Sequence, residues 1–159
     1  MCVKAIRFCL VFLVAIQSLC CADVTKLASE DRNVLQDASR FHEVHSTGDL
    51  PSAVIALCTN GDGKRAEPGG KWNATDSIID PTLPGKRLIW AAVGGDYYVV
   101  HYERGGIAHT FHILVAKSAK NDTKPQVVWS AVGGPFKDYA AFLDALRTGK
   151  LDDRMDYAR

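Results

Sequence analysis

Four stretches rich in β-branched and aromatic residues constrain the fold of this chain more than any other feature. They cover residues 87–93, 97–103, 107–116 and 126–132. This composition is typical of β-strands. Short glycine-containing segments separate the first three stretches, and such links join neighbouring antiparallel strands. The pattern therefore predicts a meander of four strands.

Two short helices are expected before the sheet. The first has Ser29 at its start, followed by apolar residues at helical spacing. Its end is ambiguous, because residues 41–45 also fit an extended segment. The second helix has Asp49 as its N-cap and Pro51 in its first turn, and Gly61 lies past its end.

A third helix is expected after the last strand, opened by Pro135 and ended by Gly149. Its apolar stripe consists of Phe136, Tyr139, Phe142, Leu143 and Leu146. Packing this stripe and the short N-terminal helices on the sheet would bury their apolar surfaces. The sequence thus predicts a two-layer α+β fold around a mainly antiparallel four-stranded meander sheet.

The first 22 residues have the pattern of a secretory signal peptide. Two basic residues precede an apolar run over 8–16, and small residues at Cys20 and Ala22 suit cleavage before Asp23. The run is shorter than the roughly 20 residues that span a bilayer. We therefore expect residues 1–22 to be removed on export, and the mature chain to have no membrane span.

The remaining segment, 23–159, is expected to form a single small α+β domain. Loss of Lys4 and Arg7 changes the formal charge from +1 to −1, and Cys58 is the one cysteine of five that remains. An exported domain without an internal disulfide favours a bacterial periplasm over a eukaryotic exterior. Near-neutral charge disfavours a nucleic-acid partner. The glycine pairs match no phosphate-binding motif, so no cofactor is expected.

A long irregular connection over residues 59–86 contains many glycines and prolines. Loops of this length in compact domains are commonly functional. Trp72 is expected to anchor the loop to the body of the domain, because it has the largest apolar surface to bury there.

The hairpin over residues 101–112 carries the densest set of functional groups. Its candidate binding side chains are His101, Glu103, Arg104, His109 and His112. Trp72 of the 59–86 loop is a further candidate binding residue. A two-residue turn would place His101, Glu103 and His112 on one face of the sheet. A three-residue loop would instead place His101 opposite His109, with Glu103 beside them and His112 on the other face.

These features lead to a functional prediction and two alternatives. The favoured hypothesis is a non-catalytic envelope protein of inhibitor or immunity type. It would bind a protein or a cell-wall-related ligand through the hairpin and the 59–86 loop, with Glu103, Arg104 and His109 pointing to solvent and Cys58 buried. The alternatives are a small hydrolase using Cys58 with a histidine, or a metal site. The metal ligands would be His101, Glu103 and His112.

Overall fold

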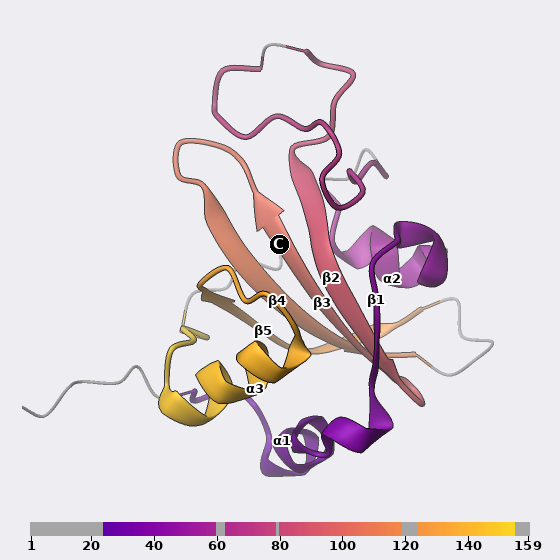
Figure 1. Cartoon of the computed structure of the whole chain (residues 1–159), viewed down its shortest axis with the longest axis vertical. Helices are drawn as coiled ribbons and strands as arrows, with labels where there is room; N and C mark the ends of the chain where they lie inside the picture. The colour runs from indigo at the N-terminus through magenta and orange to yellow at the C-terminus, as the bar shows by residue number, and fades with distance from the viewer. Residues whose placement is uncertain (1–23, 60–62, 79, 119–123, 155–159) are drawn as a thin grey trace, which may run out of the picture.

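The computed structural model describes residues 24–59, 63–78, 80–118 and 124–154 (Figure 1). The predicted signal peptide lies outside these residues. Within them the elements follow in the order α1 (Ser29–Gln36), η1 (Ala38–Arg40), β1 (His42–Val44), η2 (Thr47–Asp49), α2 (Ser52–Leu57), β2 (Lys86–Gly94), β3 (Tyr97–Arg104), β4 (Thr110–Lys117), β5 (Gln126–Gly133) and α3 (Tyr139–Thr148). None of the helices in these ranges is long and apolar enough to cross a membrane.

One antiparallel sheet with strand order β1-β2-β3-β4-β5 forms the centre of the fold. The predicted α+β class and the four-strand meander are confirmed, with β1 as an additional edge strand. The extended alternative for residues 41–45 was therefore the right one, since His42 pairs with Val93 and Val44 pairs with Ala91. The prediction of four strands fell one short because β1 has only three residues, too few to show a period.

Both faces of the sheet are covered, so the expected two-layer arrangement is wrong. One face packs against α1 and α3, and the other packs against α2. Along β3 the side chains alternate between the two cores, with Val99 in the first and Val100 in the second. Seven consecutive residues of β3 are buried, as expected for a strand covered on both sides.

Helix starts differ from the sequence expectations, and the capping residues explain why. Pro135 and Phe136 precede α3, which begins after Asp138, whose side chain accepts a hydrogen bond from the Ala141 amide at 2.7 Å. Gly149 ends the helix in the left-handed conformation, φ 68°, as predicted. Near the N-terminus, Asp49 belongs to η2 and Pro51 is the N-cap of α2.

The two ends of the described chain meet at Asp153. Its carboxylate is 1% exposed and accepts hydrogen bonds from the Thr25 amide at 2.8 Å, the Lys26 amide at 2.6 Å and Trp129 Nε1 at 3.1 Å. The Thr25 hydroxyl donates a further bond at 3.0 Å. Asp153 thereby attaches the N-terminal segment to β5.

Candidate functional site

The hairpin and the long loop lie together at one end of the sheet, where β3 ends and β4 begins (Figure 1). Arg104 pairs with Thr110, so the connection is a five-residue turn over 105–109. Both registers considered from the sequence are therefore wrong, and β4 begins at Thr110 instead of residue 107. His101 lies opposite Ile113.

The five-residue turn nevertheless places the side chains on the same faces of the sheet as a three-residue loop would. Lengthening a loop by two residues does not change which side chains of the two strands share a face. His101 and Glu103 belong to the face covered by α1 and α3, and Glu103 contacts His109. His112 lies on the opposite face, stacked against Tyr102 with ring centroids 5.0 Å apart.

The turn is long because it pairs with the 59–86 loop. The Gly105 amide donates a hydrogen bond to the Gly85 carbonyl at 3.0 Å, and Thr75 forms a parallel bridge with Gly106. A Cβ atom at Gly105 would lie 2.1 Å from the Asn73 carbonyl oxygen. The loop and the turn therefore form one continuous surface, which requires glycine at residue 105.

We expect Gly105→Ala to lower the free energy of unfolding by about 2 kcal/mol, because the added methyl group forces the two backbones apart. Chemical denaturation of the purified protein measures this loss. Gly48→Ala is the matched control, since its Cβ would meet Ser46 Oγ at an ordinary 3.5 Å. Equal stability of the two variants would contradict the close approach of loop and turn.

Glu103 links the turn to the sheet and does not point to solvent as expected. Its side chain is 6% exposed and accepts hydrogen bonds from Arg87 Nε and, at 2.7 Å, from His109 Nε2. Arg87 is its direct cross-strand partner on β2. The sequence already contained a signal for this ion pair, because Arg87 and Glu103 carry opposite charges at the facing ends of two adjacent predicted strands. Arg104 and His109 are exposed, as predicted.

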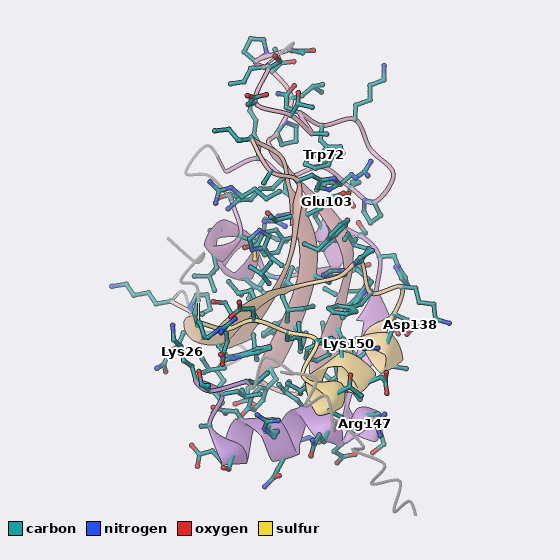
Figure 2. All side chains as sticks on the ribbon, turned by 90° about the vertical axis from the view of Figure 1, so that its left-hand side faces the viewer. Lys26, Trp72, Glu103, Asp138, Arg147 and Lys150 are labelled. Carbon is teal, nitrogen blue, oxygen red and sulfur yellow. The ribbon has the colours of Figure 1, made fainter. Side chains whose placement is uncertain are left out.

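Trp72 holds the 59–86 loop against this pair, as Figure 2 shows at the loop end of the sheet. The Arg87 guanidinium carbon lies 5.2 Å from the Trp72 ring centroid, and the His109 ring packs edge-on at 5.3 Å. Arg87 also donates to the Gly70 carbonyl at 3.2 Å. The predicted anchoring role of Trp72 is thus confirmed. Through these contacts Glu103 and Arg87 connect both the loop and the turn to the sheet.

His101 is a structural histidine whose two ring nitrogens are both occupied. Nδ1 donates to the backbone carbonyl of His112 at 2.9 Å, and Nε2 accepts from the Phe136 amide at 3.2 Å. The ring packs on Trp90 at 5.2 Å, and burial lowers the pKa of His101 to about 4.

The hypothetical metal ligands His101, Glu103 and His112 are not brought together, since His112 lies on the opposite face of the sheet. Its Nε2 is 2.8 Å from Thr110 Oγ1. Burial, with the nearby positive charge of Arg104, lowers the pKa of His112 to about 4. In the described part of the chain no group of three potential ligand side chains could hold a metal ion.

Cys58 is fully buried at the end of α2, as predicted. Burial raises the pKa of its thiol, against the opposing effect of the positive charges of Arg65 and Lys86. Within the described ranges no hydrogen bond joins Cys58 to an imidazole, so the pair needed for a thiol nucleophile is not formed there.

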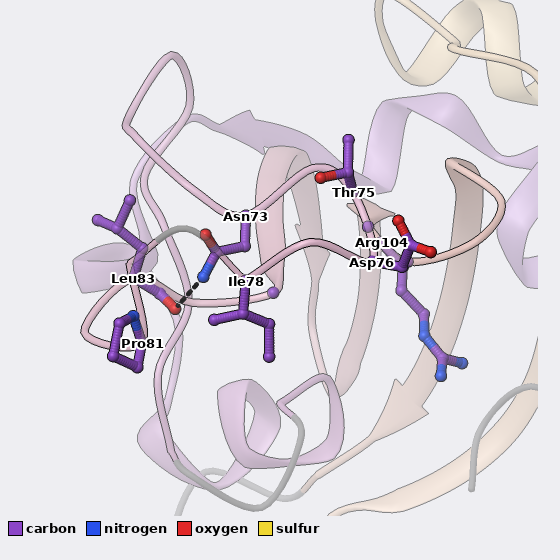
Figure 3. A pocket seen from close by; sticks show the side chains of 10 residues that line it. Asn73, Thr75, Asp76, Ile78, Pro81, Leu83 and Arg104 are labelled. Carbon is purple, nitrogen blue, oxygen red and sulfur yellow. Dashed lines mark hydrogen bonds between the residues drawn. The ribbon is translucent and has the colours of Figure 1, made fainter.

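A cleft of about 380 Å³ lies between the loop and the turn (Figure 3). Its two ends differ in chemistry: Ile78, Pro81 and Leu83 supply apolar surface, whereas Asp76 and Arg104 supply charges. The lining is held in shape by the side-chain amide of Asn73, which donates to the carbonyls of Asp80 at 2.8 Å and Leu83 at 3.0 Å.

Two large apolar side chains beside this cleft are exposed, and the sequence reasoning missed both. Ile107 at the turn is 95% exposed and Ile78 on the loop is 68% exposed. Among the described residues these are the exposed large hydrophobic side chains. The glycine pair immediately before Ile107 was the available signal, because it favours a turn over a strand there. We call Ile78, Arg104, Ile107 and the adjoining cleft the loop-end surface.

Comparison with protein-family models, with curated proteins and with solved structures found no match. The function is therefore inferred from the geometry and chemistry of the loop end.

Proposed function

We propose that the protein is an exported, non-catalytic binding protein of inhibitor or immunity type, and that it docks a partner protein through the loop-end surface. Export is supported by the sequence pattern of residues 1–22. The observation that carries the docking proposal is the pair of exposed isoleucines, Ile78 and Ile107, beside a charged cleft. Exposed apolar groups bordered by polar ones are typical of interaction surfaces.

Rigidity of the loop-end surface supports the proposal further. Gly105 is bonded to Gly85, and Glu103 fixes His109 at the end of the turn. A surface that is ordered before association loses little conformational entropy when it binds. Apolar anchors of this kind favour a protein partner over a cell-wall polysaccharide, which has few apolar groups to receive them.

No observation on the described residues favours the hydrolase alternatives. Cys58 is buried without an imidazole partner, and the proposed metal ligands lie on two faces of the sheet. The described hydroxyl nearest to an imidazole at this end of the sheet is Thr110 Oγ1, 2.8 Å from His112 Nε2. Burial lowers the pKa of His112 to about 4, so this imidazole is a weak base for activating a hydroxyl.

We expect Ile107→Asp to weaken partner binding by about tenfold or more, because it places a charge at the apolar anchor. Thermal stability should not change, since the side chain is exposed. The partner is first captured from the envelope fraction with a photo-crosslinker at residue 107, and its affinity for each variant is then titrated.

Ala38→Asp is the control for this experiment, because Ala38 is an exposed apolar residue outside the loop-end surface. It should leave the affinity unchanged. Crosslinking from residue 38 with the same yield as from residue 107, or equal affinities of the two variants, would rule out docking through the loop-end surface.

A further inference from the structure

The cleft between the loop and the turn has an apolar side and a charged side. Ile78, Pro81 and Leu83 form the apolar side, and Asp76 and Arg104 lie on the other side (Figure 3). Its volume of about 380 Å³ is at the small end of the range for ligand pockets, roughly 300–1,000 Å³. The cleft is therefore large enough for a small molecule that carries both apolar and charged groups.

Asp76 and Arg104 give the cleft one negative and one positive group, and both side chains are exposed. Within the described residues no ion pair includes either of them, although they line the same cleft. A carboxylate binds an ammonium group, and a guanidinium binds a carboxylate, by charge-assisted hydrogen bonds. The charged side can therefore bind two ligand groups of opposite charge.

The backbone that carries the two charges is fixed before any ligand binds. Thr75, which directly precedes Asp76, forms a parallel bridge with Gly106 of the turn. Gly105, which directly follows Arg104, is bonded to the loop through its amide at 3.0 Å. A cleft whose walls are already ordered loses little conformational entropy on binding.

We propose that this cleft binds a free α-amino acid with an aliphatic side chain, such as leucine. The ligand carboxylate would accept two parallel hydrogen bonds from the Arg104 guanidinium, and its ammonium group would donate to the Asp76 carboxylate. The aliphatic side chain would lie on the apolar side of the cleft and remove that surface from water. Each end of a peptide carries one of the two charges, so a free amino acid matches the cleft better than a peptide end.

This site goes beyond the proposed docking function, because it needs no partner protein. The two proposals can also fail separately. Ile107 is not among the residues that line the cleft. Ile107→Asp should therefore weaken docking and leave the affinity for leucine unchanged.

The test is a titration of the purified, isotope-labelled protein with L-leucine, followed by NMR. The backbone amides of Thr75, Gly105 and Gly106 should shift and saturate, whereas those of α3 should not move. Leucinamide lacks the carboxylate and N-acetylleucine lacks the ammonium group. Each should bind at least about fivefold more weakly than leucine, the loss expected for one charge-assisted contact in a partly exposed cleft. Glycine keeps both charges without a side chain and should also bind more weakly.

Arg104→Gln and Asp76→Asn each remove one charge at an exposed position, so both variants should fold. Each should weaken leucine binding at least about fivefold, for the same reason as the altered ligands. The losses from Arg104→Gln and from leucinamide should not add, because both remove the same contact. Arg40→Gln and Asp144→Asn are the matched controls, exposed in η1 and α3 away from the cleft, and should keep the full affinity.

Four results would overturn the proposal. The first is no shift of the cleft amides with leucine at its solubility limit. The second is equal affinity for leucine, leucinamide and N-acetylleucine, which would show apolar contact alone. The third is unchanged leucine affinity in both Arg104→Gln and Asp76→Asn. The fourth is dependence on only one of these two residues, because the ligand would then be an acid or an amine.

Discussion

Lowering the pH from 7 to about 4 should destabilise the protein by several kcal/mol, because two buried imidazoles must remain neutral in the fold. The pKa values of His101 and His112 are about 4 in the folded protein, compared with 6.5 for an unperturbed histidine. Between these values the unfolded chain binds more protons than the folded one. The contribution of each histidine is therefore complete above pH 6.5 and is lost progressively as the pH falls towards 4.

The size of this effect follows from the two shifts. One pKa unit corresponds to about 1.4 kcal/mol, so each histidine contributes on the order of 3 kcal/mol. Both side chains are at most 2% exposed, so solvent screens these interactions little. Urea denaturation at a series of pH values between 7 and 4 measures the loss directly.

His112→Phe separates the two contributions, since phenylalanine can stack on Tyr102 but cannot take up a proton. The slope of stability against pH should then be roughly halved. His45→Gln should leave the slope unchanged, because His45 is 63% exposed. A stability that does not change between pH 7 and 4.5 would contradict the burial of both imidazoles.

The same two histidines show what the sequence could reveal about the fold. Richness in β-branched and aromatic residues located all four main strands, apart from the early start given to β4, and the capping glycine at residue 149 located the end of α3. The number of residues in the turn after β3 depended on a contact with Gly85, twenty residues earlier in the chain. No local pattern contains such a contact, so the sequence left open which face His112 occupies.

Burial of Glu103 and exposure of Ile107 were missed for a related reason. Glu103 was expected to face water, as charged residues usually do, and Ile107 was placed at the start of a strand. In the structure Arg87 and His109 stabilise the buried carboxylate, and pairing of the turn with the loop leaves Ile107 outside the sheet. The sequence thus located the polar residues of the hairpin at one end of the sheet. It did not predict which of their side chains are buried and which are exposed.

Asp153→Ala should lower the free energy of unfolding by about 3–5 kcal/mol, the loss expected when a buried charged acceptor is removed. The carboxylate accepts bonds from the backbone of Thr25 and Lys26 and from the Trp129 indole. Alanine would remove the acceptor of all three donors, of which the Trp129 indole is buried. Urea denaturation at pH 7 measures the change.

Asp152→Ala is the adjacent control. Among the residues that the structure describes, its carboxylate bonds to Arg154, two residues away, and it is partly exposed, so we expect a loss below about 1 kcal/mol. Similar losses for the two variants would show that Asp153 does not hold the N-terminal segment.

Acid titration provides an independent check on Asp153. Burial opposes its charge, but the bonds from Thr25, Lys26 and Trp129 outweigh burial and lower the pKa of its carboxyl below the usual 3.8. Its contribution is therefore complete above pH 3.8 and is lost only as the pH falls below that value. This window lies below the one in which the histidines act, so the two effects separate along the pH axis.

Truncation of the N-terminal segment tests whether the Asp153 carboxylate stabilises the fold by binding that segment. Removing residues up to Lys26 deletes the donors of Thr25 and Lys26, and buried Val24 with them, so the truncated protein should be destabilised at least as much as Asp153→Ala. Combining the two changes should cost clearly less than their sum, because both remove the same hydrogen bonds. Full additivity would mean that the N-terminal segment stabilises the fold by another route. The predicted cleavage before Asp23 leaves Thr25 as the third residue of the mature chain. The hydrogen bonds to Asp153 would therefore limit how many N-terminal residues can be removed before the fold is destabilised.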